Sequence, residues 1–210
     1  MRFTKPCQSD RPARSDRFDV FSPKLGRPLT LFSYLQLQQW LLLEAFPSVK
    51  AFCERPDLLE SEDGKAVLID FWIQGASNEF FLVIRDDDSP KLRTRASSLR
   101  IRYLRSSHLN GWGILAKNWQ SMLPYVVAYR HWLTNDDTVE IVKRCSTPVT
   151  LRELENSFPS KEPSWVRACV FDALAKGLLQ TQSLRTKPWN QLLHLWVILH
   201  KGRPTVRIPS

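Results

Sequence analysis

An aspartate inside an apolar run is the first candidate for chemistry in this sequence. Asp70 has three apolar residues on each side, in Val67-Leu-Ile-Asp-Phe-Trp-Ile73. An ionised carboxylate that is buried without a partner costs several kcal/mol, so it must be paired, hold a metal ion or face a cleft. The sequence therefore singles out Asp70 as a candidate site residue.

A helix and two strands are expected to position this carboxylate. Apolar residues recur at steps of three to four between Leu31 and Phe46, which predicts an amphipathic helix that ends at Pro47. Residues 66–73 and 79–85 predict two adjacent, largely buried strands. A helix followed by paired buried strands indicates an α/β or α+β core.

Two groups of basic residues favour a polyanionic partner. The 210-residue chain has a formal net charge of +9, and clustered positive charge is typical of nucleic-acid binding. Residues 1–30 predict a basic arm, either lying in a nucleic-acid groove or solvated. Residues 91–105 contain no acid and predict a phosphate-contacting surface, part of it helical, with a solvated helix face as the alternative. The candidate contacts are Lys24, Arg27, Lys91, Arg93, Arg95, Arg100, Arg102 and Arg105.

Three short helices are predicted in the last third of the chain. Residues 136–145 predict the first. Thr150, followed by Glu153, forms a capping box that starts the second. Ser164 opens the third, which ends at Gly177 as a C′ glycine. This order predicts a separate small domain over residues 135–205, after a first domain over residues 31–134.

Two strands, residues 178–181 and 193–199, follow around a basic loop. Three helices and a hairpin with a basic tip are the order of a winged helix-turn-helix, whose third helix usually enters the major groove. The alternative is that this domain docks a protein. The candidate DNA contacts here are Lys161, Arg167, Arg185 and Lys187, with Lys176 also on the third helix.

The cysteines and the apolar runs bear on whether the protein binds zinc or spans a membrane. The four cysteines, Cys7, Cys53, Cys145 and Cys169, form no C-x-x-C pair, and with four scattered histidines they give no zinc-ligand spacing. They predict reduced thiols in an intracellular protein. No run approaches the length of a membrane span, so no membrane partner is expected.

The chain resembles the TnsA-type transposon endonucleases. The similar segments are Ser22-Pro-Lys-Leu-Gly-Arg27, Ser33-x-x-Gln36, Leu41-Leu-Leu-Glu-Ala-Phe-Pro-Ser-Val49 and Asp70-Phe-Trp72. The resemblance covers nearly the whole chain and implies a restriction-endonuclease-like mixed sheet with flanking helices, followed by a winged-helix domain. It also implies double-stranded DNA at transposon ends, a DDE transposase (TnsB-like) and an AAA+ regulator (TnsC-like) as partners, in the cytoplasm at the bacterial nucleoid.

The family's nuclease centre needs a helix-borne glutamate, a strand-borne aspartate and a Glu/Gln-x-Lys on the next strand, which together hold Mg²⁺ and orient the attacking water. The resemblance places Gln36 at the glutamate, Asp70 at the aspartate, and Leu82 and Ile84 at the last motif. One carboxylate alone binds Mg²⁺ weakly. The sequence thus predicts a DNA-binding subunit that has lost catalysis, with Asp70 bonded to a backbone N–H or to an arginine such as Arg85.

Two alternatives remain open at this point. The first is an active, Mg²⁺-dependent endonuclease that uses Asp70 with Glu44 or Glu79 in a shifted site. The second is a winged-helix regulator whose N-terminal domain binds only protein. Cleavage that depends on Asp70 would distinguish the first from the second.

Overall fold

A computed structural model gives the fold and describes residues 2–7, 11–86, 92–93 and 99–197. The chain is mixed α/β and divides into two compact units. Among the described residues, the first comprises those up to 43 and from 48 to 111, and the second those from 44 to 47 and from 112 to 197. The sequence predicted a boundary near residue 135; the structure instead groups the long helix that follows residue 112 with the second unit.

A β-hairpin occupies much of the segment that was expected to be an unpacked arm. Strands β1 (Phe18–Ser22) and β2 (Arg27–Leu31) pair antiparallel, and Gly26 supplies the positive φ of the turn. Leu29 and Leu31 are buried. The expectation of an arm does not hold for these residues, because the average polarity of thirty residues conceals a short strand whose alternate side chains are apolar.

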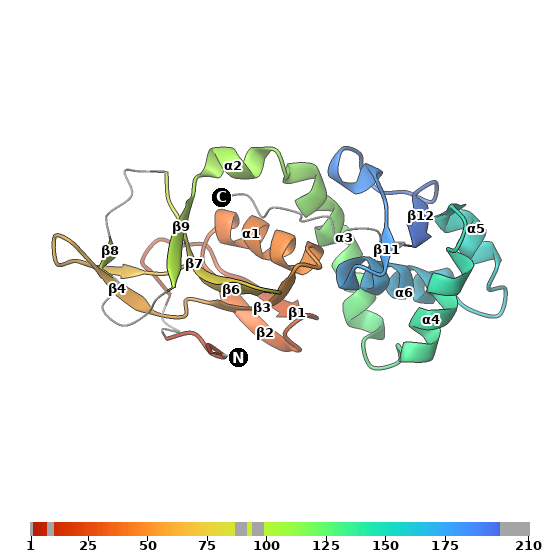
Figure 1. Ribbon diagram of the computed structural model, residues 1–210, viewed down its shortest axis with the longest axis horizontal. Helices are drawn as coiled ribbons and strands as arrows, with labels where there is room; N and C mark the ends of the chain where they lie inside the picture. The colour runs from red at the N-terminus through yellow and green to blue at the C-terminus, as the bar shows by residue number, and fades with distance from the viewer. Residues whose placement is uncertain (1, 8–10, 87–91, 94–98, 198–210) are drawn as a thin grey trace. The chain divides into compact units, whose positions relative to one another are not determined.

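A four-stranded mixed sheet forms the centre of the first unit. Its order is β3-β6-β7-β9, with β6 antiparallel to β3 and β7, and β9 parallel to β7. Helix α1, predicted from the apolar spacing, lies alongside this sheet (Figure 1). The elements are α1 (Tyr34–Ala45), β3 (Val49–Glu54), β6 (Phe71–Gly75), β7 (Glu79–Ile84) and β9 (Arg100–Leu104).

The strand predicted over residues 66–73 is interrupted at Asp70. Its first part is β5 (Ala66–Leu68), which belongs to a separate sheet of order β5-β4-β8, and its second part is β6. The other members of that sheet are β4 (Leu58–Ser61) and β8 (Leu92–Arg93). The Asp70 N–H donates to the Leu82 carbonyl of β7 at 3.1 Å. Asp70 therefore lies where the chain passes from one sheet to the other.

Part of the basic stretch is a strand, although a helix was expected there. Ile101 and Tyr103 of β9 pack against a buried cluster that contains Trp72 and Phe81. Alternate residues of a strand point to opposite faces, so the basic residues of β9 lie on the other side. In the sequence, the many basic residues made this alternation of apolar and basic side chains, which is typical of a strand, difficult to recognise. Helix α2 (Ser106–Asn110) follows directly.

The second unit contains the three predicted helices. They are α4 (Asn135–Arg144), α5 (Leu151–Asn156) and α6 (Pro163–Lys176), preceded by the longer α3 (Gly113–Tyr129). The predicted capping box is confirmed, with the Thr150 hydroxyl accepting from the Glu153 N–H, and Gly177 ends α6 at φ +73°. A small antiparallel sheet of order β10-β12-β11 completes the unit, from β10 (Val149–Thr150), β11 (Leu179–Gln180) and β12 (His194–Val197), with the 3₁₀ turn η1 (Ser183–Arg185).

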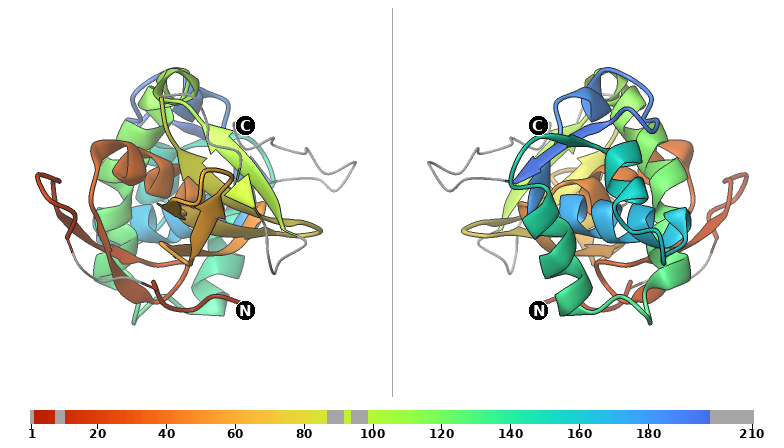
Figure 2. Two further views of the ribbon diagram at one scale, coloured as in Figure 1. Left: turned by 90° about the vertical axis from the view of Figure 1, so that its left-hand side faces the viewer. Right: turned by 90° about the vertical axis from the view of Figure 1, so that its right-hand side faces the viewer.

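Helix α6 is the core of the second unit. Helices α3, α4 and α5 all pack against it (Figure 2). Within α6, only the end residues Pro163 and Lys176 are exposed. Within the described residues, no helix is both long and apolar enough to cross a membrane.

Candidate functional site

The Asp70 carboxylate is held by one side-chain and one backbone donor. Its Oδ1 accepts from Gln36 Nε2 at 2.7 Å, and its Oδ2 accepts from the Ile84 N–H at 2.6 Å. Gln36 is fixed in turn, because its Oε1 accepts from the Phe32 N–H at 2.8 Å and its own N–H donates to the Ser33 hydroxyl at 3.1 Å. The structure thus brings together α1, the β5–β6 junction and β7 at the three positions where the resemblance places the nuclease motif.

The electrostatics of Asp70 follow from this enclosure. Burial raises the pKa of its carboxyl to about 6 from 3.8, and the bonds from Ile84 and Gln36 oppose that rise without cancelling it. The charge of Arg85 makes a smaller contribution in the same direction as those bonds, towards a lower pKa. Arg85 therefore acts on Asp70 at a distance, whereas the amide of Gln36 and the backbone N–H of Ile84 bond to the carboxylate directly.

The residues around Asp70 do not fit a Mg²⁺ site. Glu79 accepts from Trp72 Nε1 at 3.1 Å and from Arg2 at 3.3 Å, and Glu44 is buried at 2% exposure. In the described part of the chain, no three His, Cys, Asp or Glu side chains are grouped closely enough to hold a metal ion. Mg²⁺ gives up its hydration only to several anionic oxygens, and here Asp70 supplies one carboxylate already bonded to two donors.

Two basic residues of the expected arm are engaged inside the first unit. Lys24 Nζ donates to the Leu43 carbonyl near the C-terminus of α1 at 2.6 Å, where a positive charge also complements the helix dipole. Arg27 donates Nη1 to Glu54 Oε1 at 2.8 Å and Nη2 to Glu54 Oε2 at 2.6 Å. The paired Arg27 has both terminal nitrogens engaged by Glu54, whereas the bond of Lys24 uses one of the three donors of its ammonium group.

Strand β9 places two arginines beside a hollow in the first unit. Arg100 and Arg102 are two residues apart and therefore lie on one face. They line a cavity of about 410 Å³ with Glu79 and Phe80, and the Arg102 guanidinium lies 4.1 Å from the Phe80 ring centre. Arg105, just after β9, is exposed. Of the other predicted contacts, Lys91, Arg95 and the side chain of Arg93 lie outside the described residues.

The basic side chains on helix α6 and just before it, which the sequence marked as DNA contacts, have partners within the second unit. Arg167 donates to Glu155 at 2.7 Å and to the Tyr125 hydroxyl at 3.3 Å. Lys161, just before the helix, lies 4.6 Å from the Trp165 ring centre, and Lys176 pairs with Asp172 in the last turn. Helices α3, α4 and α5 pack against α6, and the expectation that α6 reads DNA bases stays a prediction.

The basic loop between β11 and β12 is fixed by a buried asparagine. Asn118 Nδ2 donates to the carbonyls of Leu184 and Lys187 at 2.7 and 2.8 Å, and its Oδ1 accepts from the Trp189 N–H at 3.0 Å. Arg185 stacks over Trp112 at 3.9 Å. The loop thus presents Arg185 and Lys187 from a rigid backbone.

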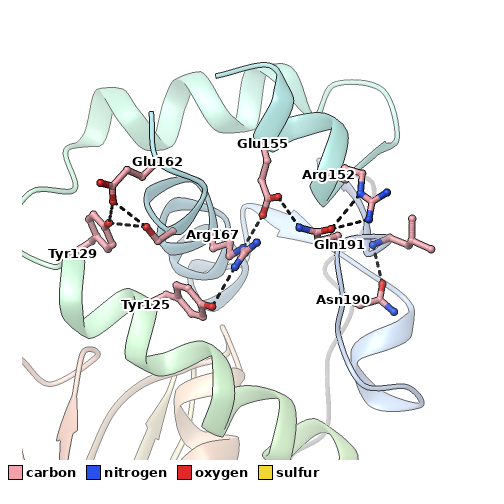
Figure 3. Close-up of polar contacts among 10 residues, drawn as sticks. Tyr125, Tyr129, Arg152, Glu155, Glu162, Arg167, Asn190 and Gln191 are labelled. Atoms are coloured by element: carbon pink, nitrogen blue, oxygen red, sulfur yellow. Dashed lines mark hydrogen bonds and ion pairs between the residues drawn. The ribbon is translucent and has the colours of Figure 1, made fainter. Parts of the chain in front are cut away.

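A second hollow of about 410 Å³, the α5–loop groove, lies in the second unit. It is lined by Arg152, Arg167, Trp189, Asn190, Gln191 and Leu192. A continuous polar chain builds its wall (Figure 3): Gln191 Oε1 accepts from Arg152 Nε and Nη2 at 3.2 and 2.8 Å, and Gln191 Nε2 donates to Glu155 at 3.4 Å. Glu155 in turn accepts from Arg167.

Sequence reasoning missed Arg152, Gln191 and Asn118. Arg152 and Gln191 are 39 residues apart in the chain, and Asn118 reaches residues 66 to 71 positions away. No local pattern links them. The capping box at Thr150 predicted helix α5, but it gave no information about what α5 faces.

The comparisons with known proteins add no family. No protein-family model and no curated protein matches the chain. The site must therefore be interpreted from its own geometry.

Proposed function

We propose that this protein is a TnsA-like DNA-binding subunit of a transposition system, in which a restriction-endonuclease-like centre has become a structural hydrogen-bond network. The observation that carries the proposal is the meeting of Gln36, Asp70 and Ile84. The resemblance assigns these positions to one catalytic centre, and Gln36 and Ile84 lie 34 and 14 residues from Asp70 in the chain.

The chemistry of this meeting point supports binding without cleavage. Gln36 contributes a side-chain amide where a second carboxylate is required, and the Nε2 of that amide is already bonded to Asp70. Ile84 contributes only its backbone N–H, where the family has a lysine side chain. A centre of this kind has neither the anionic oxygens for a divalent ion nor a cation to stabilise a phosphate in the transition state.

The basic residues of β9 support contact with a phosphate backbone. Arg100 and Arg102 lie on one face of β9 beside a cavity, and Arg105 is the residue after the end of this strand. In the second unit, three helices and the β10-β12-β11 sheet support a winged helix of the kind that carries DNA or protein contacts at its hairpin. The partners implied by the resemblance are a DDE transposase and an AAA+ regulator at transposon ends.

The test uses labelled duplex DNA with the element's ends, in Mg²⁺ or Mn²⁺, with wild type and Asp70→Asn. We expect salt-sensitive binding, equal in both proteins, and no strand cleavage. Cleavage by the wild type that Asp70→Asn abolishes would overturn the proposal and establish the endonuclease alternative. Absence of any duplex binding would reject both.

A charge-matched pair of variants tests the DNA surface. Replacing Arg100 and Arg102 by Ala should reduce the slope of log K against log salt by roughly 0.9 for each phosphate that the protein no longer neutralises. The control replaces Lys117 and Lys143, two exposed residues of the second unit, and removes the same charge. An equal change in slope for both pairs would mean that the basic residues of β9 form a solvated face and do not contact phosphates.

The regulator alternative predicts a different footprint. A winged-helix regulator would bind at a promoter through the loop of Arg185 and Lys187, and would be indifferent to Arg100 and Arg102. The same two variants therefore separate this alternative from the proposal, since protection of element ends that requires β9 is expected only for the latter.

A further inference from the structure

We infer that the α5–loop groove binds an acidic peptide segment of a partner protein, with a carboxylate on a lining arginine, Arg152 or Arg167, and an apolar side chain on Leu192. This inference deepens the proposed function, which gives the chain protein partners, and rests on it in that respect. The groove lies wholly within the second unit.

The two guanidinium groups are fixed before any ligand arrives. Arg152 is oriented by two bonds to Gln191, and Arg167 by bonds to Glu155 and Tyr125 (Figure 3). A side chain that is already immobile gives up less conformational entropy when it binds. Preorganised guanidinium groups of this kind suit the planar carboxylate.

Each of these two lining arginines retains donor capacity. Within the part of the chain that the structure describes, Arg152 Nη1 and Arg167 Nη2 have no hydrogen-bond partner, since the bonds described above use Nε and one terminal nitrogen of each. Arg152 and Arg167 carry two positive charges against the one negative charge of Glu155, which leaves the wall cationic. The charge therefore favours an anionic group of the ligand.

The apolar part of the groove distinguishes a peptide from nucleic acid. Leu192 is 62% exposed and lines the groove, so it offers apolar surface that a ligand can cover. Trp189 is held on the same side by Phe171, with ring centres 5.1 Å apart, and by a bond from its Nε1 to Ser121. A peptide that alternates acidic and apolar side chains meets both parts, with an aliphatic side chain on Leu192 that the sugar–phosphate backbone of a duplex lacks.

The chain's own C-terminal segment does not suit this groove. Residues 198–210 carry Lys201, Arg203 and Arg207 and no acidic residue. Like charges would oppose the docking of this segment beside Arg152 and Arg167. The charge complementarity therefore points to a segment from another protein.

The test uses the full chain and a fluorescein-labelled peptide of alternating glutamate and leucine, measured by fluorescence anisotropy. The matched probe replaces every glutamate by glutamine. We expect the acidic peptide to bind at least tenfold more tightly than the glutamine peptide, because the glutamine peptide cannot form a charge-assisted hydrogen bond to a fixed guanidinium.

Three variants locate the binding. Arg152→Gln should weaken binding of the acidic peptide by about tenfold or more, because a charged donor is lost. Leu192→Ser should weaken binding by about fivefold, because the peptide then buries less apolar surface. Lys143→Gln on α4 removes an exposed charge outside the groove lining and should leave the affinity unchanged. Arg152 and Leu192 are exposed, so their replacement should leave the far-UV circular dichroism and the melting curve unaltered.

The outcomes separate this inference from the proposed function. Equal affinity for the two peptides, or no effect of Arg152→Gln and Leu192→Ser, would overturn the inference. Displacement of the peptide by a single-stranded oligonucleotide, with the same two variants weakening the oligonucleotide, would reassign the groove to nucleic acid. Duplex binding is measured on the same samples: peptide binding without duplex binding would reject the DNA-binding proposal and leave the groove assignment in place.

Discussion

Two ion pairs, one in each unit, have nearly the same burial and opposite consequences. Arg27 pairs with Glu54 at 2.6 Å in the first unit, and Arg167 pairs with Glu155 at 2.7 Å in the second. The arginine side chains are 25% and 21% exposed, and the glutamates 3% and 6%. The amino-acid sequence marked both arginines as candidate DNA contacts. Their environments differ in which nitrogens are used.

Arg27 gives both terminal nitrogens to one carboxylate, whereas Arg167 divides its bonds. The fork-to-fork pairing of Arg27 with Glu54 occupies the geometry with which arginine grips a phosphate or carboxylate. Arg167 uses Nε for Glu155 and Nη1 for Tyr125. The first pair therefore serves the fold, and the second retains a donor for a ligand. The role of an arginine depends on its unused donors more than on its exposure.

The largest expected effect breaks the first pair. Replacing Glu54 by Gln removes the negative charge opposite Arg27 in a mostly buried setting, and removal of one member of such a pair typically costs 3 to 5 kcal/mol. We expect the free energy of unfolding to fall by about 4 kcal/mol, measured by urea denaturation followed by tryptophan fluorescence.

The matching change at the second pair is Glu155→Gln. Glu155 accepts one bond from Arg167 and one from Gln191, and Arg167 keeps its bond to Tyr125 in the variant, so a smaller decrease of about 2 kcal/mol is expected. Equal decreases in the two variants would contradict the distinction between a closed pair and an open one. The affinity for the peptide probe should change only for Glu155→Gln, because Glu155 bonds to Arg167 and Gln191 of the groove lining, whereas Glu54 lies in the first unit.

Asp70 sharpens the comparison, because it is a carboxylate without an arginine bonded to it. Its pKa is raised to about 6 by burial, so the folded protein binds the proton more tightly than the unfolded chain does. The stabilisation by the protonated form is fully present below the ordinary pKa of 3.8 and is lost as the pH rises through 6. With about 1.4 kcal/mol for each pKa unit, and some screening by solvent, a decrease in stability of about 2 kcal/mol is expected.

The measurement compares wild type with Asp70→Asn at pH 4 and pH 7. The asparagine does not titrate, so the difference between the two proteins isolates Asp70 from carboxyls of lowered pKa such as Asp63 and Asp86. The stability of the wild type should decline relative to Asp70→Asn as the pH rises. A relative gain would mean that Asp70 behaves as an ordinary paired carboxylate.

Local signals in the sequence predicted much of the fold. The apolar spacing predicted α1, the paired apolar runs predicted β6 and β7, and the Thr150 capping box with Gly177 predicted α5 and the end of α6. These features are encoded within a few residues of one another. The interruption at Asp70 was not predicted, because an apolar run has the same composition whether it forms one strand or two.

The geometry of the candidate site depends on long-range pairing. Gln36 and Asp70 were placed at one centre by the resemblance alone, and their bond spans 34 residues. The engagement of Arg27 and Lys24 by internal partners also arises from tertiary structure, through Glu54 and the Leu43 carbonyl. The sequence shows where basic residues cluster. It does not show how many of their hydrogen-bond donors remain available to a ligand after the chain has folded.

The smallest expected effect concerns the cap of helix α5, which carries both Arg152 and Glu155 to the groove. The Thr150 hydroxyl accepts from the Glu153 N–H, and the Glu153 carboxylate accepts from the Thr150 N–H at 2.8 Å. Removal of such a cap costs about 1 kcal/mol, so Thr150→Ala should lower the free energy of unfolding by that amount. Thr134 caps α4 with the same geometry through Asp137, which makes Thr134→Ala a matched control. Both variants should decrease stability similarly, but only Thr150→Ala should weaken binding of the acidic peptide, because α5 positions an arginine of the groove lining and α4 does not. Equal weakening would mean that peptide binding depends on general stability and not on the placement of Arg152.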